Sequence, residues 1–178
     1  FNLEIKGLPN QILNEVNLSG IMGYKHQKFN FIASDGWQKS YLTNPPTTQE
    51  IEGDAIEYDI NYMMPYMGIA VFNDPNKEIN YMLKGNFIPR FWAKDHDYHI
   101  LRDKHAYAHV TGIGFYFSTD IKYKINSNWY LKGEYEYLKA TGKGSQRQMF
   151  SDGTTYENIF AEIYTLQHIV DLGFSYSF

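Results

Sequence analysis

The sequence contains no cysteine, which excludes disulfides, thiolate catalysis and cysteine-type zinc sites. It also lacks any run of about 18 apolar residues, so a membrane-spanning helix is excluded. No basic stretch followed by an apolar one stands at the start, and if the protein is exported we expect its signal peptide to have been removed. Positive charge is not in excess, since 16 basic residues are interspersed with 20 acidic ones, and this argues against a nucleic-acid partner.

Aromatic residues, by contrast, are abundant: the 178 residues include 16 Tyr, 12 Phe and 3 Trp, although the mean hydropathy is only -0.48. A barrel wall in lipid needs an outward apolar band, aromatic girdles at both interfaces and a polar lumen. Alternation of these two faces along each strand averages to a middling hydropathy. The composition therefore predicts an all-β protein, an antiparallel transmembrane β-barrel.

Strand signals of period two recur along the whole chain, in about seven runs. The runs cover residues 1–7, 16–32, 56–72, 81–92, 107–121, 129–137 and 170–178. In the last run, one face is apolar and the other small or polar: Val170, Leu172, Phe174, Tyr176 and Phe178 alternate with Asp171, Gly173, Ser175 and Ser177. This ending resembles the C-terminal insertion signal of outer-membrane barrels; the alternative is a half-buried strand of a soluble β-sandwich.

The predicted connections alternate in length. Short turns at residues 73–76 and 126–128 separate long polar loops at residues 34–54, 94–104 and 141–155. Short periplasmic turns and long extracellular loops are typical of outer-membrane barrels. Pro65 lies inside a run and predicts a bulge there, with a shift of phase before Phe72.

The predicted architecture is a single outer-membrane β-barrel domain over residues 1–178. Bacterial single-chain barrels have an even number of strands, and the first run is short. An open sheet edge cannot face lipid, because its N–H and C=O groups would lack partners. We therefore expect further strands upstream of Phe1 to complete the barrel.

Ionisable residues cluster in one segment, at Asp95, Asp97 and His99. Side chains at alternate positions of an extended backbone point the same way, so these three would share one side of the wall. A carboxylate beside an imidazole holds its tautomer and stabilises the imidazolium, which would make His99 a general base for a water nucleophile. Two other interpretations remain open: a solvated polar loop and a divalent-metal site.

The chain resembles the C-terminal portion of an omptin, a family of outer-membrane endopeptidases built on a ten-stranded barrel. The similarity spans essentially all 178 residues. It rests on five segments in the family's order: residues 1–7, 20–24 and 64–68, the alternate residues Asp95, Asp97 and His99, and the closing segment 172–178.

The resemblance implies that a His–Asp couple and an Asp–Asp pair on opposite walls activate a water to cleave a peptide bond next to Arg or Lys. His99 would be the base, Asp97 its orienting partner, and Asp95 part of an acidic pocket for the basic side chain, which would form a charge-assisted pair. No cofactor or metal is implied. The family's Asp–Asp pair lies upstream of the segment that Phe1 begins, so this chain does not contain it.

The resemblance also implies outer-membrane localisation, an active site that faces the cell exterior, and activity that requires lipopolysaccharide held by basic residues on the outer wall. Asn61 stands where an arginine is usual. We therefore expect an omptin-like endopeptidase that acts on polypeptides. The alternatives are a non-catalytic barrel, acting as an adhesin or structural protein with the same fold, and a soluble β-sandwich binding module.

Overall fold

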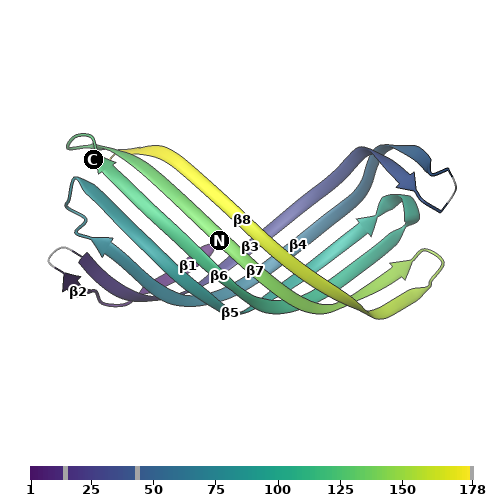
Figure 1. Ribbon diagram of the computed structural model, residues 1–178, viewed down its shortest axis with the longest axis horizontal. Coiled ribbons are helices and arrows are strands. Elements are labelled where there is room, and N and C mark those ends of the chain that lie inside the picture. Colours follow the sequence, from purple (N-terminus) through teal and green to yellow (C-terminus); the bar gives the residue numbers. More distant parts are fainter. Residues whose placement is uncertain (14–15, 43–44, 177–178) are drawn as a thin grey trace.

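A computed structural model describes residues 1–13, 16–42 and 45–176 as one antiparallel sheet of eight strands (Figure 1). The strands are β1 (Asn2–Lys6), β2 (Asn10–Leu13), β3 (Val16–Ser40), β4 (Thr47–Asn73), β5 (Ile79–His99), β6 (Lys104–Lys124), β7 (Trp129–Phe150) and β8 (Thr155–Tyr176). Their order in the sheet is β1-β3-β4-β5-β6-β7-β8, and β2, which lies between the predicted runs 1–7 and 16–32, pairs with β3. A single 3-10 turn, η1 (Ile100–Arg102), joins β5 to β6. None of the described helical residues form a helix long and apolar enough to cross a membrane.

The strands from β3 to β8 are 21 to 27 residues long. At about 3.3 Å per residue they extend roughly 70 to 90 Å, whereas about ten residues suffice to cross a bilayer. The predicted long loops are therefore wrong, because β3, β4, β5 and β7 continue through most of them. The connections at that end are only residues 41–46, 100–103 and 151–154; Asn44, within the predicted first loop, lies outside the described residues.

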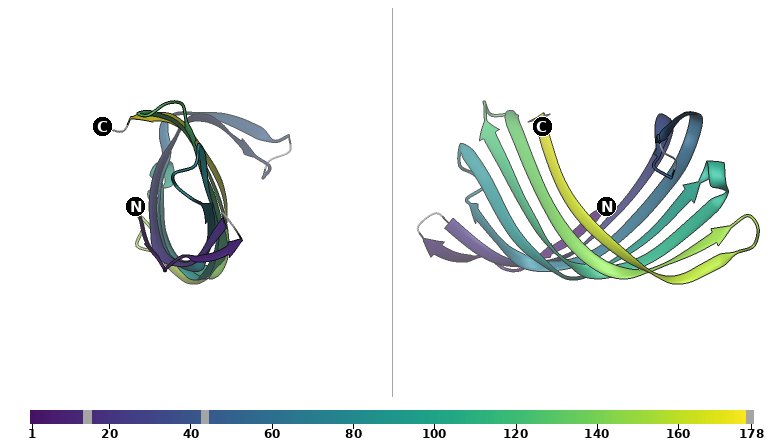
Figure 2. Two further views of the ribbon diagram at one scale, coloured as in Figure 1. Left: turned by 90° about the vertical axis from the view of Figure 1, so that its left-hand side faces the viewer. Right: turned by 45° about the vertical axis from the view of Figure 1, so that its right-hand side comes forward.

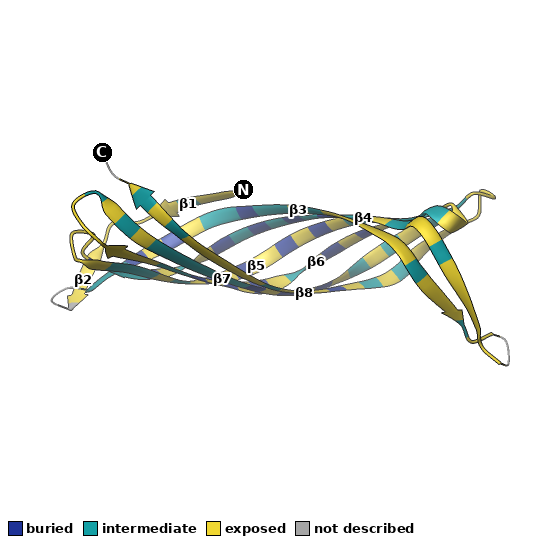
Figure 3. Ribbon diagram, turned by 90° about the horizontal axis from the view of Figure 1, so that it is seen from above, coloured by how far each residue is buried: buried dark blue, intermediate teal, exposed yellow. Residues whose placement is uncertain are grey.

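The two faces of these strand ends explain the error. Both faces of the β3–β4 hairpin near its turn are exposed (Figure 3), and both carry polar residues. The alternation of hydropathy disappears there. β3 and β4 nevertheless stay paired up to the turn, where Ser40 lies opposite Thr47. Backbone pairing, which the hydropathy pattern does not report, extends the strands beyond the apolar band.

The bulge lies in β5 rather than at Pro65. The β3–β4 register runs without interruption through Pro65 and the buried face of β4 keeps its phase, so the predicted phase shift is wrong. The pairing of β4 with β5 is nevertheless irregular between Met63 and Met67, the stretch that contains Pro65. At the same level, β5 loses register with β6 between Ile88 and Phe91. Between these two positions β5 has two residues, Pro89 and Arg90, where β6 has only one. Proline has no N–H to donate, which suits it to an unpaired bulge position.

The sheet is rolled, as the end-on view in Figure 2 shows. Side chains from strands that are not neighbours in the sheet meet on its inner face. Lys25 Nζ of β3 donates to Glu136 Oε2 of β7 at 2.5 Å, and the Tyr62 hydroxyl of β4 lies 2.7 Å from the Thr165 hydroxyl of β8. The inner face is therefore the interior of the roll.

The outer face is an apolar band at one end of the strands. Its exposed residues include Leu3, Ile5, Met22, Met67, Ile69, Phe87, Ile113, Phe115, Phe117, Leu131, Val170, Leu172, Phe174 and Tyr176. The predicted outward face of the last strand is confirmed for the residues up to Tyr176, while Ser177 and Phe178 lie outside the described residues. A continuous exposed apolar band of this kind suits contact with lipid.

The interior at the level of this band is packed with apolar and aromatic side chains and also carries paired charges. Met64, Tyr66, Ile88 and Phe91 are fully buried there. Close to them, Lys84 Nζ pairs with Glu4 Oε1 at 3.0 Å, and the Tyr66 hydroxyl donates to the other Glu4 oxygen at 3.0 Å. Buried charges need such partners, because an unpaired one would carry a large desolvation cost.

Candidate active site

Asp95, Asp97 and His99 lie at the end of β5, next to η1, and above the apolar band. The β4–β5 register pairs them with Ile60, Tyr58 and Ile56 in turn. Because alternate residues of a strand share a face, the three side chains lie on the inner face with the buried residues Ala93 and Phe91 of the same strand. The structure thus brings all three predicted residues to one side of the wall.

His99 and Asp97 form a couple. His99 Nε2 lies 3.0 Å from Asp97 Oδ2, and both side chains are about a quarter exposed, at 24% and 27%. With the proton on Nε2, this nitrogen donates to the carboxylate and leaves the Nδ1 lone pair free as a base. Asp97 Oδ1 is buried and has no hydrogen-bond partner among the described residues, so it can still accept one.

Asp95 is held by two donors. Its Oδ1 accepts the backbone N–H of Ala108 at 2.9 Å, and its Oδ2 accepts the Tyr58 hydroxyl at 3.2 Å. Burial raises the pKa of the Asp95 carboxyl above its ordinary value of 3.8, and these two hydrogen bonds oppose the rise. A cationic side chain placed against Asp95 would stabilise its charged form, as an acidic pocket for Arg or Lys requires.

Sequence reasoning missed Tyr58 as a site residue. It lies within the predicted strand run 56–72, and a hydrogen bond to a carboxylate on the next strand cannot be found without the register. Burial beside Asp95 raises the pKa of Tyr58, so its hydroxyl stays protonated and remains a donor to the carboxylate. The detectable signal was the alternation of Tyr58 with the acidic residues Glu57 and Asp59, which fixes its face.

Asn61 lies on the opposite, outer face. Its Oδ1 is 2.7 Å from His26 Nε2, and it lines a shallow groove together with Lys28, Lys94 and His109. No group of three or more His, Cys, Asp or Glu residues in the described part of the chain is arranged to hold a metal ion. The outer wall at the level of the site is therefore polar and carries basic side chains.

Long antiparallel strands with an apolar outer band and a polar interior define the class of outer-membrane β-barrels. The model of the omptin family matches residues 1–178, and the chain belongs to this family of outer-membrane proteases. Membership of this family supports the predicted barrel and argues against the alternative of a soluble β-sandwich.

The structure is similar to the crystal structure of the outer membrane protease OmpT from Escherichia coli, with a TM-score of 0.82 and 18% sequence identity. The match covers 99% of this chain and 62% of that chain, so the chain spans less than two thirds of the OmpT length. The predicted all-β barrel fold is confirmed, although no pairing of β1 with β8 closes the sheet within the described residues. A search among curated proteins gave no match.

Proposed function

We propose that this chain supplies the His–Asp half of an endopeptidase site that cleaves polypeptides next to a basic residue. The observation that carries the proposal is the 3.0 Å contact between His99 Nε2 and Asp97 Oδ2, with the partly buried Asp95 carboxylate two residues before Asp97 on the same face. Membership of the omptin family supports it. Asp95 would bind the basic side chain and thereby place the adjacent peptide bond beside the couple.

The proposed chemistry needs no covalent enzyme intermediate. His99 Nδ1 takes a proton from a water molecule while the water oxygen bonds to the peptide carbonyl carbon. Asp97 orients the ring and stabilises the imidazolium that forms. When the C–N bond breaks, the imidazolium returns the proton to the leaving amine. The Asp–Asp pair that the family resemblance places on the opposite wall is not in this chain and would complete the site.

We further propose that the site end of the barrel faces the cell exterior and that lipopolysaccharide binds the outer wall there. Support comes from the position of the site beyond the apolar band, and from Lys28 and Lys94 in the outer groove. Lysine ammonium groups bind phosphate as point charges. Asn61 contributes only a neutral amide, so we expect weaker dependence on the lipid than an arginine would give.

The test is cleavage of a fluorogenic peptide with an Arg-Arg bond by the full-length protein, refolded in detergent with lipopolysaccharide. We expect activity that His99→Ala abolishes, that His105→Ala on the outer wall leaves intact, and that resists chelators. Loss of activity on chelation would favour the metal interpretation instead. A correctly folded wild-type barrel that cleaves nothing would leave the adhesin or structural role.

A further inference from the structure

An aromatic shelf lies on the inner wall beside the proposed catalytic residues. We define it as Phe29 and Phe31 of β3 with Tyr58 and Tyr62 of β4. Neighbouring rings are in contact: the Phe29 and Phe31 centroids are 6.0 Å apart, those of Phe31 and Tyr58 6.3 Å, and those of Phe29 and Tyr62 6.4 Å. The shelf is therefore one continuous surface across two strands.

The register fixes how the shelf meets the site. Phe31 pairs with Tyr58, which pairs with Asp97 on β5. One row further along, Phe29 pairs with Ile60, which pairs with Asp95. The rings of Phe29, Phe31 and Tyr58 thus occupy the same two rows of the wall as the two carboxylates. Tyr62 lies one row further along, opposite Ala93.

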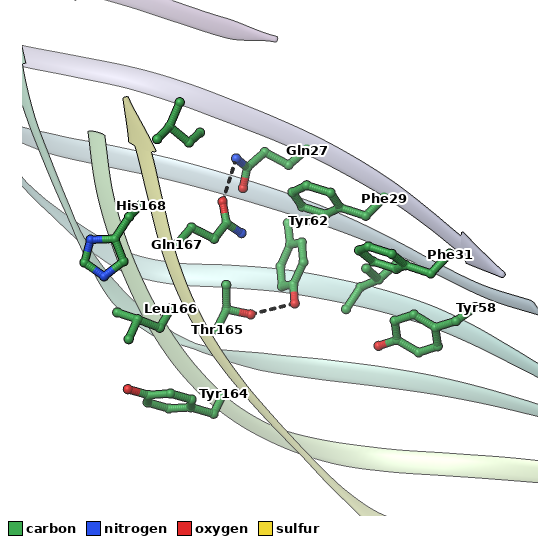
Figure 4. Close-up of a pocket in the computed structure, with 12 residues that line it drawn as sticks. Gln27, Phe29, Phe31, Tyr58, Tyr62, Tyr164, Thr165, Leu166, Gln167 and His168 are labelled. Carbon is green, nitrogen blue, oxygen red and sulfur yellow. Dashed lines mark hydrogen bonds between the residues drawn. The ribbon is translucent and has the colours of Figure 1, made fainter. Parts of the chain in front are cut away.

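A cavity of about 570 Å³ lies between the shelf and residues 164–169 of β8, at the edge of β8 that has no strand beside it among the described residues (Figure 4). Figure 4 shows Gln27, Phe29, Phe31 and Tyr58 in a row on one side and Thr165 and Gln167 of β8 on the other. Pockets that bind ligands are mainly apolar with a few placed polar groups, and this cavity has that character.

One polar atom of the cavity lacks a partner. Gln27 Nε2 donates to Gln167 Oε1 at 3.0 Å, but the carbonyl oxygen of Gln27 is buried and accepts no hydrogen bond within the described residues. A buried acceptor without a hydrogen bond carries a desolvation penalty. An N–H group of a bound molecule that donated to Gln27 Oε1 would remove this penalty. A peptide backbone provides such an N–H, whereas a purely apolar ligand does not.

We propose that the aromatic shelf is a subsite for an aromatic side chain of the polypeptide substrate, two positions from the basic residue that Asp95 binds. This inference rests on the proposed function. In an extended peptide, residues two apart share a side and lie about 7 Å from each other. Neighbouring strands are about 4.8 Å apart, so β4 and β3 lie about 5 and 10 Å from Asp95 on β5, which brackets that spacing.

Tyr58 links the two subsites. Its ring belongs to the shelf, and its hydroxyl donates to Asp95 Oδ2 at 3.2 Å. An incoming aromatic ring would pack edge-to-face or offset against Phe31 and Tyr58. The substrate class is therefore polypeptides that carry an aromatic residue near Arg or Lys, rather than any chain with a basic residue.

The first experiment compares peptides that share one Arg-Arg bond and carry Phe or Ser two positions from the basic residue, on either side. For the wild-type, full-length protein in detergent with lipopolysaccharide, we expect kcat/KM to be roughly tenfold higher for the Phe peptide on one side. In the Phe29→Ala/Phe31→Ala variant this ratio falls to about one, with the effect mainly in KM. The matched control is Phe87→Ala/Phe115→Ala, which removes two contacting rings from the outer face and should keep the ratio.

The second experiment measures binding of the same labelled peptides to His99→Ala by fluorescence anisotropy. Tighter binding of the Phe peptide, lost in the shelf variant, supports the subsite even if no peptide is cleaved, in which case only the proposed function fails. Equal binding and equal kcat/KM of the Phe and Ser peptides by folded wild-type protein would overturn the subsite while leaving the protease intact. Variants that do not refold are replaced by Phe29→Leu/Phe31→Leu, which keeps the volume and removes the rings.

Discussion

At the residue scale, partial burial makes the charged form of Asp95 less favourable, although the proposed binding of a basic side chain requires that form. Burial penalises its charged form, while the N–H of Ala108 and the hydroxyl of Tyr58 partly compensate. Because burial has the largest effect, the pKa of Asp95 lies above its ordinary value, so burial shifts the balance toward the neutral form. A bound Arg or Lys would shift the balance back, so substrate binding and ionisation of Asp95 are coupled.

Tyr58→Phe tests this coupling. The change removes a hydrogen bond that lowers the Asp95 pKa, so the pKa should rise further. Basic peptides bind the ionised carboxylate, so their affinity is full above the Asp95 pKa and is lost as the pH falls through it. We expect the midpoint of the affinity profile to lie above pH 3.8 in the wild type and at higher pH in Tyr58→Phe, measured by anisotropy with His99→Ala as background. An unmoved midpoint would show that the hydroxyl does not act on Asp95.

Asp97→Asn tests the couple. The asparagine amide has nearly the same shape as the carboxylate, but it does not stabilise the imidazolium and does not reliably orient the ring. We therefore expect kcat to fall roughly a hundred- to ten-thousand-fold with little change in KM. The assay is single-turnover cleavage of the Arg-Arg peptide. Asp103→Asn, in the exposed connection after η1, is the matched control and should keep full activity. Equal losses in both variants would point to general disruption of this end of the barrel.

At the element scale, the β6–β7 ladder depends on close backbone approach. A Cβ at Gly112 would lie 2.0 Å from the Thr141 carbonyl oxygen and 2.4 Å from Gly142 Cα. Only glycine lets the two strands keep this spacing at an inner-face position. Gly85, in contrast, has open space where its Cβ would stand.

Gly112→Ala should therefore separate β6 from β7 and lower the free energy of unfolding by about 1–3 kcal/mol. Gly85→Ala should be neutral or slightly stabilising, since alanine loses less conformational freedom on folding. Urea unfolding followed by heat-modifiable gel migration measures both. If the two variants unfold at the same urea concentration, the backbone contact does not limit stability.

The elements also show what the sequence could and could not reveal. Outward alternation in the last strand predicted the exposed faces of Leu172 and Phe174, and the spacing of Asp95, Asp97 and His99 predicted their common side. Strand ends that meet water on both faces carry no alternation, so the sequence predicted loops there. The bulge at Pro89 and the Tyr58–Asp95 contact depend on register, which a single sequence does not specify.

At the scale of the whole molecule, the outer and inner faces of the sheet have different roles. The outer band suits contact with lipid, whereas the inner face holds paired charges at the level of the band and the candidate site beyond it. β8 pairs with β7 alone, so its other edge has no strand beside it among the described residues. In lipid such an edge needs a partner, which agrees with a chain that spans 62% of the OmpT length.

The last prediction concerns the position of the apolar band along the strands. Phe115 is 57% exposed within the band, whereas Met149, 38% exposed, lies on the same outer face at the site end of β7. An arginine in the middle of the band must leave water, so Phe115→Arg should lower the free energy of unfolding in lipid vesicles by about 2–4 kcal/mol, and Met149→Arg by no more than about 1. Phe115→Ala separates the charge from the lost ring contact with Phe87. If Met149→Arg proved the costlier change, the band would have to lie at the site end, and His99 would face lipid depth rather than the water that its proposed chemistry consumes.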